Sequence, residues 1–188
     1  NISHEWLLNN IPADKRIMRQ FLKCGYIDKK RLFPTEEGSP QGGLVSPTYA
    51  NLTLDGLEVL LQKEYSTSST GHYNANYNKH KVHLCRYADD FIITSDSEEV
   101  LTEVRSLVES FMEARGLKLS NEKTVITNIN VGFDFLGWNF RKFKGKLLVQ
   151  PSVKSKKKVT QKLSQIIKTY RQAEQDLLIH KLNEVTKG

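Results

Sequence analysis

Residues 82–94 have the sequence VHLCRYADDFIIT, in which apolar residues flank the adjacent carboxylates Asp89 and Asp90. The pattern predicts two short strands joined near the aspartate pair, which is a hairpin with two carboxylates at its turn. Neighbouring carboxylates repel each other unless water or a cation surrounds them. Aspartate is also common in ordinary turns. The stretch by itself therefore leaves a metal site and a plain turn as alternatives.

A glycine-rich segment, GSPQGGLVSP at residues 38–47, leads into a predicted helix that starts at Ser46-Pro47. Three glycines within six residues allow the backbone to approach a ligand closely. The side-chain amide of Gln41 could contact a base edge or a sugar. The segment lacks the Lys-Ser/Thr pair of a Walker loop, and a glycine-rich turn without a ligand is the alternative.

Periodicity and turn residues place these two motifs in an α+β chain. Helices are predicted over residues 4–11, 15–24, 46–61, 96–115 and 152–186, and strands over 82–94, 117–129 and 133–149. The helix from 96 has capping-box spacing at Ser95 and Glu98. The last helical segment has an apolar stripe that is expected to be buried: Val159, Leu163, Ile166, Ile167 and Tyr170. The order of elements favours an antiparallel sheet with helices on one face.

The basic residues gather near the C-terminal end. The 188 residues include 28 Lys or Arg and 21 Asp or Glu, a net charge of +7. Residues 1–140 carry 15 basic and 18 acidic side chains, whereas residues 141–188 carry 13 and 3, a net charge of +10. A solvated helix face and a surface for a polyanion both account for this segment.

Composition excludes several classes of protein. The hydrophobic fraction of 38% is enough for a core, which excludes a disordered tail. No apolar run reaches the roughly 18 residues of a membrane span. The two cysteines, Cys24 and Cys85, make no disulfide framework and favour a reducing compartment. Cys85 is expected to be buried on its strand. The first residue is Asn1, so the chain is expected to be a piece of a longer protein.

Taken together, the motifs and their order resemble the palm of group II intron-encoded reverse transcriptases/maturases over nearly the whole chain. Residues 40–43 (PQGG) resemble the template- and nucleotide-contacting loop, and residues 87–90 (YADD) resemble the catalytic metal box. Residues 116–124 and 135–138 (FLGW) resemble the next palm motif and the primer-grip hairpin. The resemblance implies a right-hand polymerase palm over 1–150, incomplete at its N-terminus, and a helical start of the thumb over 151–188.

The resemblance also implies roles for particular residues. Asp89 would hold both Mg²⁺ ions, with Mn²⁺ as an alternative metal, and Asp90 would support the site or bind metal more weakly. Lys123 would meet the departing pyrophosphate. A surface lysine is the alternative for Lys123, and core packing is the alternative for the hairpin residues. Substrate would contact Pro40, Gln41, Gly42, Tyr87, Ala88, Phe135, Gly137 and Trp138.

The implied activity is RNA-directed DNA synthesis in the cytoplasm of a bacterium or in an organelle, with no membrane partner. The partners would be an RNA template or intron RNA, a DNA primer and a deoxynucleoside triphosphate. The family needs a further catalytic aspartate and fingers upstream of Asn1, which a separate chain could supply, so the chain alone is expected to be inactive. The alternatives are a non-enzymatic RNA-binding maturase, a degenerate remnant, or a relative from phage defence or a CRISPR system.

Overall fold

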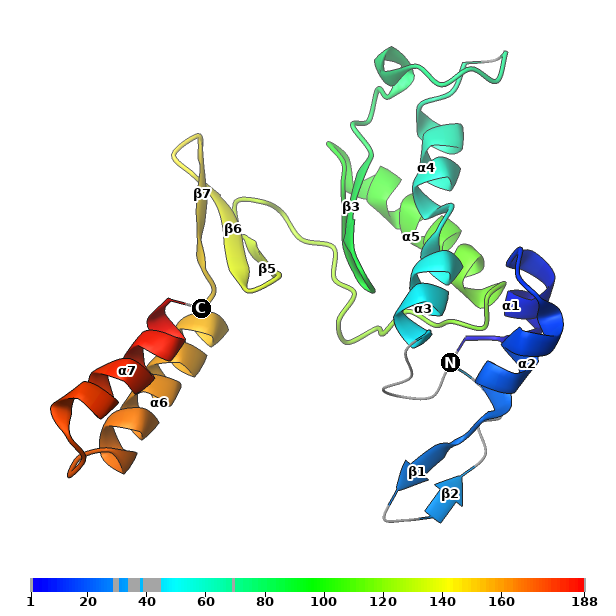
Figure 1. Cartoon of the computed structure of the whole chain (residues 1–188). Coiled ribbons are helices and arrows are strands. Elements are labelled where there is room, and N and C mark those ends of the chain that lie inside the picture. The colour runs from blue at the N-terminus through cyan, green and yellow to red at the C-terminus, as the bar shows by residue number, and fades with distance from the viewer. Residues whose placement is uncertain (1, 29–30, 34–37, 39–44, 69, 188) are drawn as a thin grey trace. The chain divides into compact units, whose positions relative to one another are not determined.

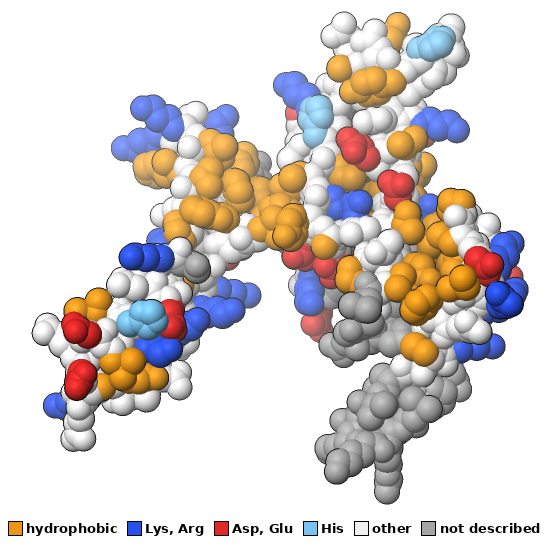
Figure 2. All heavy atoms as spheres, in the orientation of Figure 1, with side chains coloured by type: hydrophobic (Ala, Val, Ile, Leu, Met, Phe, Trp, Pro, Cys, Tyr) orange, Lys and Arg blue, Asp and Glu red, His pale blue; other side chains and the backbone are white. Residues whose placement is uncertain are grey.

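The computed structural model describes residues 2–28, 31–33, 38, 45–68 and 70–187, and only the backbone of residues 26–28 and 31–32. The chain divides into two compact units, Asn1–Ile126 and Thr127–Gly188. Figure 1 labels most elements of both units, and Figure 2 shows the side chains in the same orientation, coloured by type. Within the described ranges, no helix is long and apolar enough to cross a membrane. The predicted boundary between a palm at 1–150 and a thumb at 151–188 stays a prediction.

Two short helices begin the first unit, α1 (His4–Asn10) and α2 (Lys15–Lys23). Each is preceded by a residue whose side chain accepts hydrogen bonds from backbone amides of the first turn, Ser3 for α1 and Asp14 for α2. Both helices were predicted from the sequence, but the Ser3 cap of α1 was not. They share a small buried core with the following helix, made of Leu7, Ile11, Met18, Leu22 and Tyr49.

The helix predicted over residues 46–61 is two helices, α3 (Ser46–Leu54) and α4 (Leu57–Tyr65). The chain breaks between them at Gly56, whose φ of +87° lies in the left-handed region that ends helices. The apolar spacing predicted one helix because Leu57 and Leu61 continue the buried positions of α3. The prediction of a single helix was therefore wrong.

Two predicted helix caps are also displaced. Val45, not Ser46, holds the N-cap position of α3, and Pro47 lies in the first turn as expected. The helix α5 (Glu98–Glu113) is capped by Ser97, whose hydroxyl accepts a hydrogen bond from the Val100 amide. Ser95 instead donates to a backbone carbonyl. The predicted capping box at Ser95 was therefore wrong by two residues.

The strands of the first unit form two separate hairpins, both antiparallel. One pairs β1 (Tyr26–Asp28) with β2 (Arg31–Phe33), and the other pairs β3 (His83–Tyr87) with β4 (Asp90–Thr94). Between α4 and β3, the described residues include a 3₁₀ turn at Ala75–Tyr77. The antiparallel, mixed α+β character predicted from the sequence is confirmed.

The larger core of the first unit lies between α4, α5 and one face of the β3–β4 hairpin (Figure 1). On the hairpin, Leu84, Phe91 and Ile93 pack against this core. Cys85 is exposed, because successive strand residues point to opposite faces, and so its predicted burial was wrong. The buried members are on the helices and in the loop before β3: Leu54, Leu57, Leu61, Val82, Val100, Val104, Val108, Phe111 and Met112.

The strand predicted within residues 117–129 is absent from this described part of the chain. Leu117 and Leu119 still pack against the larger core, so the apolar alternation that predicted a strand is real. Side-chain packing alone does not make a strand, since a ladder also needs a neighbouring backbone.

The second unit has a three-stranded antiparallel sheet followed by two helices. The strands are β5 (Phe133–Phe135), β6 (Trp138–Phe143) and β7 (Lys146–Pro151), and the turn at Lys144-Gly145 lies where it was predicted. The helices are α6 (Val153–Thr169) and α7 (Gln175–Thr186). No residue of either helix is fully buried. Leu163, Ile166 and Tyr170 are half-buried, while Val159 and Ile167 are exposed, so the predicted stripe is only partly covered.

Candidate functional site

The β3–β4 hairpin places the aspartate pair at its turn. The two strands pair from His83–Thr94 to Tyr87–Asp90, which leaves Ala88 and Asp89 as a two-residue loop. The sequence-based prediction of a hairpin with carboxylates at its turn is confirmed, with Asp90 as the first residue of β4.

The backbone of this loop is strained. Ala88 has a φ of +55°, whereas Asp89 is not in the positive-φ region. A positive φ at the first loop position alone is the pattern of a type II′ turn, in which glycine is strongly preferred there. A side chain with a Cβ atom disfavours this conformation by roughly 1–2 kcal/mol. The turn therefore needs support from its surroundings.

Both carboxylates are exposed and available to a ligand. Among the described residues, neither Asp89 nor Asp90 has a side-chain hydrogen bond or an ion pair. The neighbouring Tyr87 is 67% exposed. Two adjacent carboxylates with no neutralising partner are suited to a hard divalent cation such as Mg²⁺, which takes oxygen ligands.

The described part of the chain supplies only a portion of a metal site. It contains no group of three or more His, Cys, Asp or Glu side chains that could hold an ion. Asp89 and Asp90 fit the part of a Mg²⁺ shell that carboxylates commonly provide, where water and substrate phosphates complete the octahedron.

Arg86 forms hydrogen bonds with the backbone of this turn and with a neighbouring helix. Its Nη1 donates to the carbonyl oxygen of Ala88 at 3.0 Å and to Oδ1 of Asn51 at 3.2 Å. Asn51 belongs to α3, so the contact links the hairpin turn to the helix that follows the glycine-rich segment. Its partners are thus a backbone carbonyl and a side-chain amide, and no local sequence signal identified Asn51.

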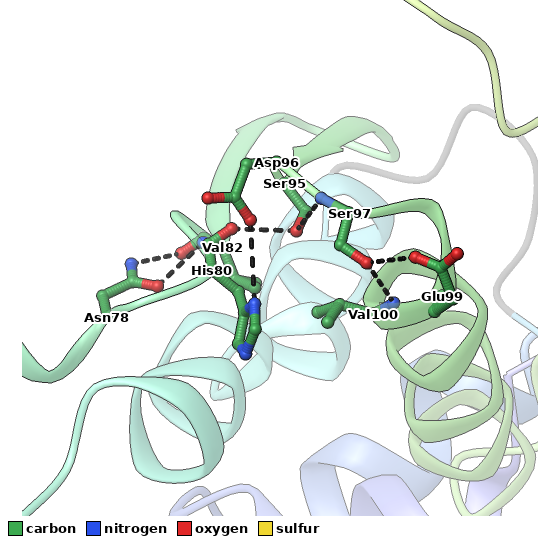
Figure 3. A network of polar contacts seen from close by, with 8 residues as sticks. All are labelled: Asn78, His80, Val82, Ser95, Asp96, Ser97, Glu99 and Val100. Atoms are coloured by element: carbon green, nitrogen blue, oxygen red, sulfur yellow. Dashed lines mark hydrogen bonds and ion pairs between the residues drawn. The ribbon is translucent and has the colours of Figure 1, made fainter.

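A polar network fixes the other end of the same hairpin (Figure 3). The carbonyl oxygen of His80 accepts hydrogen bonds from Ser95 Oγ at 2.8 Å and from the Asp96 amide at 3.1 Å. The side chain of Asn78 bonds both the amide and the carbonyl of Val82. The chain entering β3 is therefore tied to the chain leaving β4, which limits movement of the hairpin at its base.

Lys123 lies in the same compact unit as the aspartates. It is exposed, in a turn closed by hydrogen bonds from its own amide and the Thr124 amide to the Ser120 carbonyl. No contact between Lys123 and the Ala88–Asp89 loop is recorded for the described residues. Its role toward pyrophosphate stays a prediction.

The predicted primer-contacting residues surround a second hairpin turn, in the other unit. Phe135 pairs with Trp138, and Leu136-Gly137 form the loop between them. Trp138 is 49% exposed, so core packing accounts for only part of its surface. The Gly137 carbonyl accepts hydrogen bonds from the Ser152 amide and from Ser155 Oγ, each at 2.9 Å. This fixes the turn to the start of α6.

The predicted nucleotide-contacting residues Pro40, Gln41 and Gly42 lie outside the described residues. The entrance to their segment is described. The Gly38 amide donates to the Ile2 carbonyl at 3.0 Å, and His4 Nε2 lies 2.5 Å from the Gly38 carbonyl oxygen. The start of the chain therefore anchors the glycine-rich segment, a role of His4 that the sequence did not indicate.

The helices, the small antiparallel sheets and the carboxylate turn are consistent with a palm-like fragment of a reverse transcriptase. The model of the reverse transcriptase (RNA-dependent DNA polymerase) family matches residues 1–140, and the chain belongs to this family. Members of the family use divalent metal ions, in agreement with two exposed carboxylates at the turn.

Known proteins with similar sequences support this assignment. Protein YkfC of Escherichia coli (strain K12) is 29% identical over 150 residues, which cover 66% of this chain and 39% of that protein. The group II intron-encoded protein LtrA of Lactococcus lactis subsp. cremoris is 28% identical over 196 residues, covering 75% of this chain and 33% of LtrA. An uncharacterized 91 kDa protein in cob intron of Schizosaccharomyces pombe is 27% identical, covering 65% and 21%. The chain thus spans about two fifths or less of the length of these relatives.

Proposed function

We propose that this chain is part of an RNA-directed DNA polymerase of the group II intron type. The observation that carries the proposal is the Ala88–Asp89 turn in a chain of the reverse transcriptase family. The turn presents two exposed carboxylates that have no side-chain partner among the residues that the structure describes. The names of LtrA and the cob intron protein support the intron association. RNA binding alone would not need the paired carboxylates.

In the proposed reaction, a primer 3′-hydroxyl attacks the α-phosphate of a deoxynucleoside triphosphate opposite an RNA template. Asp89, with Asp90 in support, would hold two Mg²⁺ ions, or Mn²⁺ in their place. Such ions, when bound, stabilise the charge that develops on the attacking and leaving oxygens. Tyr87 and Ala88 flank the primer terminus, and Gln41 contacts the incoming nucleotide. Lys123 offers its ammonium group to the departing pyrophosphate.

The chain by itself is proposed to be inactive, because its described residues hold no third ligand beside the two aspartates. A primer-extension assay on an RNA template tests this. The chain is assayed alone and mixed with a protein segment that carries the fingers and first palm strand of a relative such as LtrA. Extension in the mixture that depends on Mg²⁺ and stops with EDTA supports the proposal, and full-rate extension by the chain alone contradicts it.

The matched variants are Asp89→Asn and Asp96→Asn, which make the same chemical change on the same hairpin. Asp89→Asn is expected to abolish extension, since one metal-ligating charge is lost. Among the described residues, the carboxylate of Asp96 has only a 3.7 Å contact with the His80 ring, and both side chains are exposed. Asp96→Asn should therefore retain activity. An equal loss of primer extension in both variants would show that disturbance of the hairpin, rather than loss of the Asp89 carboxylate, stops the reaction.

A second function, binding of structured intron RNA, is favoured by the charge of α6. This helix contains six exposed lysines and no acidic residue: Lys154, Lys156, Lys157, Lys158, Lys162 and Lys168. Lys154, Lys158 and Lys162 follow one another at i,i+4 spacing, where like charges repel on an isolated helix. A phosphate backbone would relieve this repulsion and release counterions.

RNA binding is tested by measuring the affinity of a structured intron RNA at several salt concentrations. Changing Lys154, Lys158 and Lys162 to Gln should lower the affinity and flatten the salt dependence by about two to three counterions. The control changes Lys63, Lys79 and Lys118, exposed lysines of the first unit. Similar losses in both triple variants would show that net charge, rather than α6, binds the RNA.

A further inference from the structure

The strained turn that carries Asp89 is held by a side chain that does no chemistry itself. Arg86 precedes the loop by two residues and is half-buried. A single nitrogen, Nη1, bonds both the Ala88 carbonyl at 3.0 Å and Asn51 Oδ1 at 3.2 Å. The Ala88 carbonyl lies in the loop, where it has no partner in the strand ladder. Arg86 therefore joins the loop backbone to α3.

We propose that Arg86 and Asn51 are positioning residues that hold the Ala88–Asp89 loop in its left-handed conformation. The inference rests on the proposed function in so far as the held conformation is the one that binds a divalent cation. Without the guanidinium, the loop has an alanine at a position that favours glycine, and relaxation of Ala88 would move the Asp89 carboxylate.

The partners of Arg86 also leave the two carboxylates of the turn unoccupied. The guanidinium bonds the loop backbone and an amide, whereas Arg105 in the same unit pairs with a carboxylate, Glu109. A positive charge thus lies beside the turn without occupying the oxygens of Asp89 or Asp90. Both carboxylates are therefore left free to bind a cation.

Substitutions of Arg86, Asn51 and Ala88 separate this role from general stability. Arg86→Ala removes both hydrogen bonds, and Asn51→Ala removes only the bond to α3. Ala88→Gly relieves the strain at the first loop position, since glycine adopts a positive φ freely. If Arg86 acts by holding the strained loop, adding Ala88→Gly to Arg86→Ala should restore the wild-type loop conformation and the Mn²⁺ affinity. Arg105→Ala is the matched control, because Arg105 also bonds an asparagine side chain, at Asn121.

The experiment records amide NMR spectra of the ¹⁵N-labelled chain, first without metal and then during titration with Mn²⁺. The wild type should give one signal each for Ala88, Asp89 and Asp90. Arg86→Ala should split or broaden these signals and raise the Mn²⁺ concentration for half-maximal broadening at Asp89 about fivefold, as for loss of one partly exposed charge-assisted hydrogen bond. Asn51→Ala should have a smaller effect, and Arg105→Ala none.

Two results would overturn the positioning role. One is a single, unshifted set of loop signals in Arg86→Ala, and the other is a double variant with Ala88→Gly that behaves like Arg86→Ala alone. If Arg86→Ala unfolds the chain, the Asn51→Ala spectrum decides in its place. A wild type whose Asp89 signal does not respond to Mn²⁺ would count against the cation site of the proposed function, while the metal-free spectra would still decide the positioning role.

Discussion

Nε of Arg115 donates a 2.8 Å hydrogen bond to the carbonyl oxygen of Thr53, 62 residues earlier in the chain. Thr53 is in the last turn of α3, where carbonyl groups lack partners within the helix. The same guanidinium lies over the ring of Phe111 from the larger core, and over Trp6, which packs against the smaller one. Arg115 therefore links both cores of the first unit.

Replacing Arg115 should destabilise the first unit strongly. Arg115→Ala should lower the free energy of unfolding by about 2–3 kcal/mol. The variant loses the hydrogen bonds to the Thr53 and Phe111 carbonyl groups and both ring contacts. Arg115→Lys should lose less, because an ammonium keeps the charge but cannot reach both carbonyl groups. Urea denaturation followed by circular dichroism measures both values. Arg105→Ala, on the exposed side of α5, is the control and should change stability by less than about 1 kcal/mol.

The displaced cap of α5 can be tested by mutation. Ser97→Ala removes the hydroxyl that accepts from the Val100 amide and should lower the free energy of unfolding by about 1 kcal/mol. Ser106→Ala, within the same helix, should have little effect, because its hydroxyl only bonds a carbonyl already used by the helix. The thermal midpoints of the two variants give the comparison. A greater loss for Ser106→Ala would contradict Ser97 as the cap.

Ser97 also gives the stability a pH dependence. Its hydroxyl donates to Glu99 at 2.5 Å and, together with the Glu99 backbone amide, lowers the pKa of that carboxyl. A lowered pKa in the folded state contributes stability above the unfolded pKa, and this contribution disappears as the pH falls through the folded pKa. Ser97→Ala should raise the pKa of Glu99 toward its ordinary value. Carboxyl NMR titration of both proteins measures it, and an unchanged Glu99 would refute the prediction.

Two glycines of the second unit provide a matched pair. Gly137 and Gly145 both lie in hairpin loops, with φ of +83° and +79°. A Cβ at Gly145 would meet nothing, but at Gly137 it would lie 3.0 Å from Ser155 Oγ, which bonds the Gly137 carbonyl. Gly145→Ala should therefore cost about 1 kcal/mol from backbone strain alone.

Gly137→Ala should cost more than Gly145→Ala, since Ser155 must also move and release the turn. Chemical denaturation monitored by Trp138 fluorescence compares the two variants, and adding Ser155→Ala to Gly137→Ala should recover the difference. Equal losses at both glycines would show that the contact with Ser155 does not hold the turn.

Helix ends, hairpins and turns that are specified by neighbouring residues could be predicted from the sequence. Asp14 and Pro12 set the ends of the first helices, the apolar run around the aspartate pair fixed the β3–β4 hairpin, and Lys144-Gly145 marked the turn of the second sheet. Caps, turn residues and periodicity act over a few residues, so they can be recognised in the sequence. The motif order also determined the family.

The tertiary structure decided which of these elements share a surface and what holds the site. Arg86 of β3 meets Asn51 of α3 across 35 residues, and Arg115, after α5, meets Thr53 of α3 across 62 residues. The alternation in residues 117–129 predicted a strand, but its leucines pack on helices without a neighbouring backbone. Contacts across such distances depend on how whole elements pack, which no short window of sequence contains.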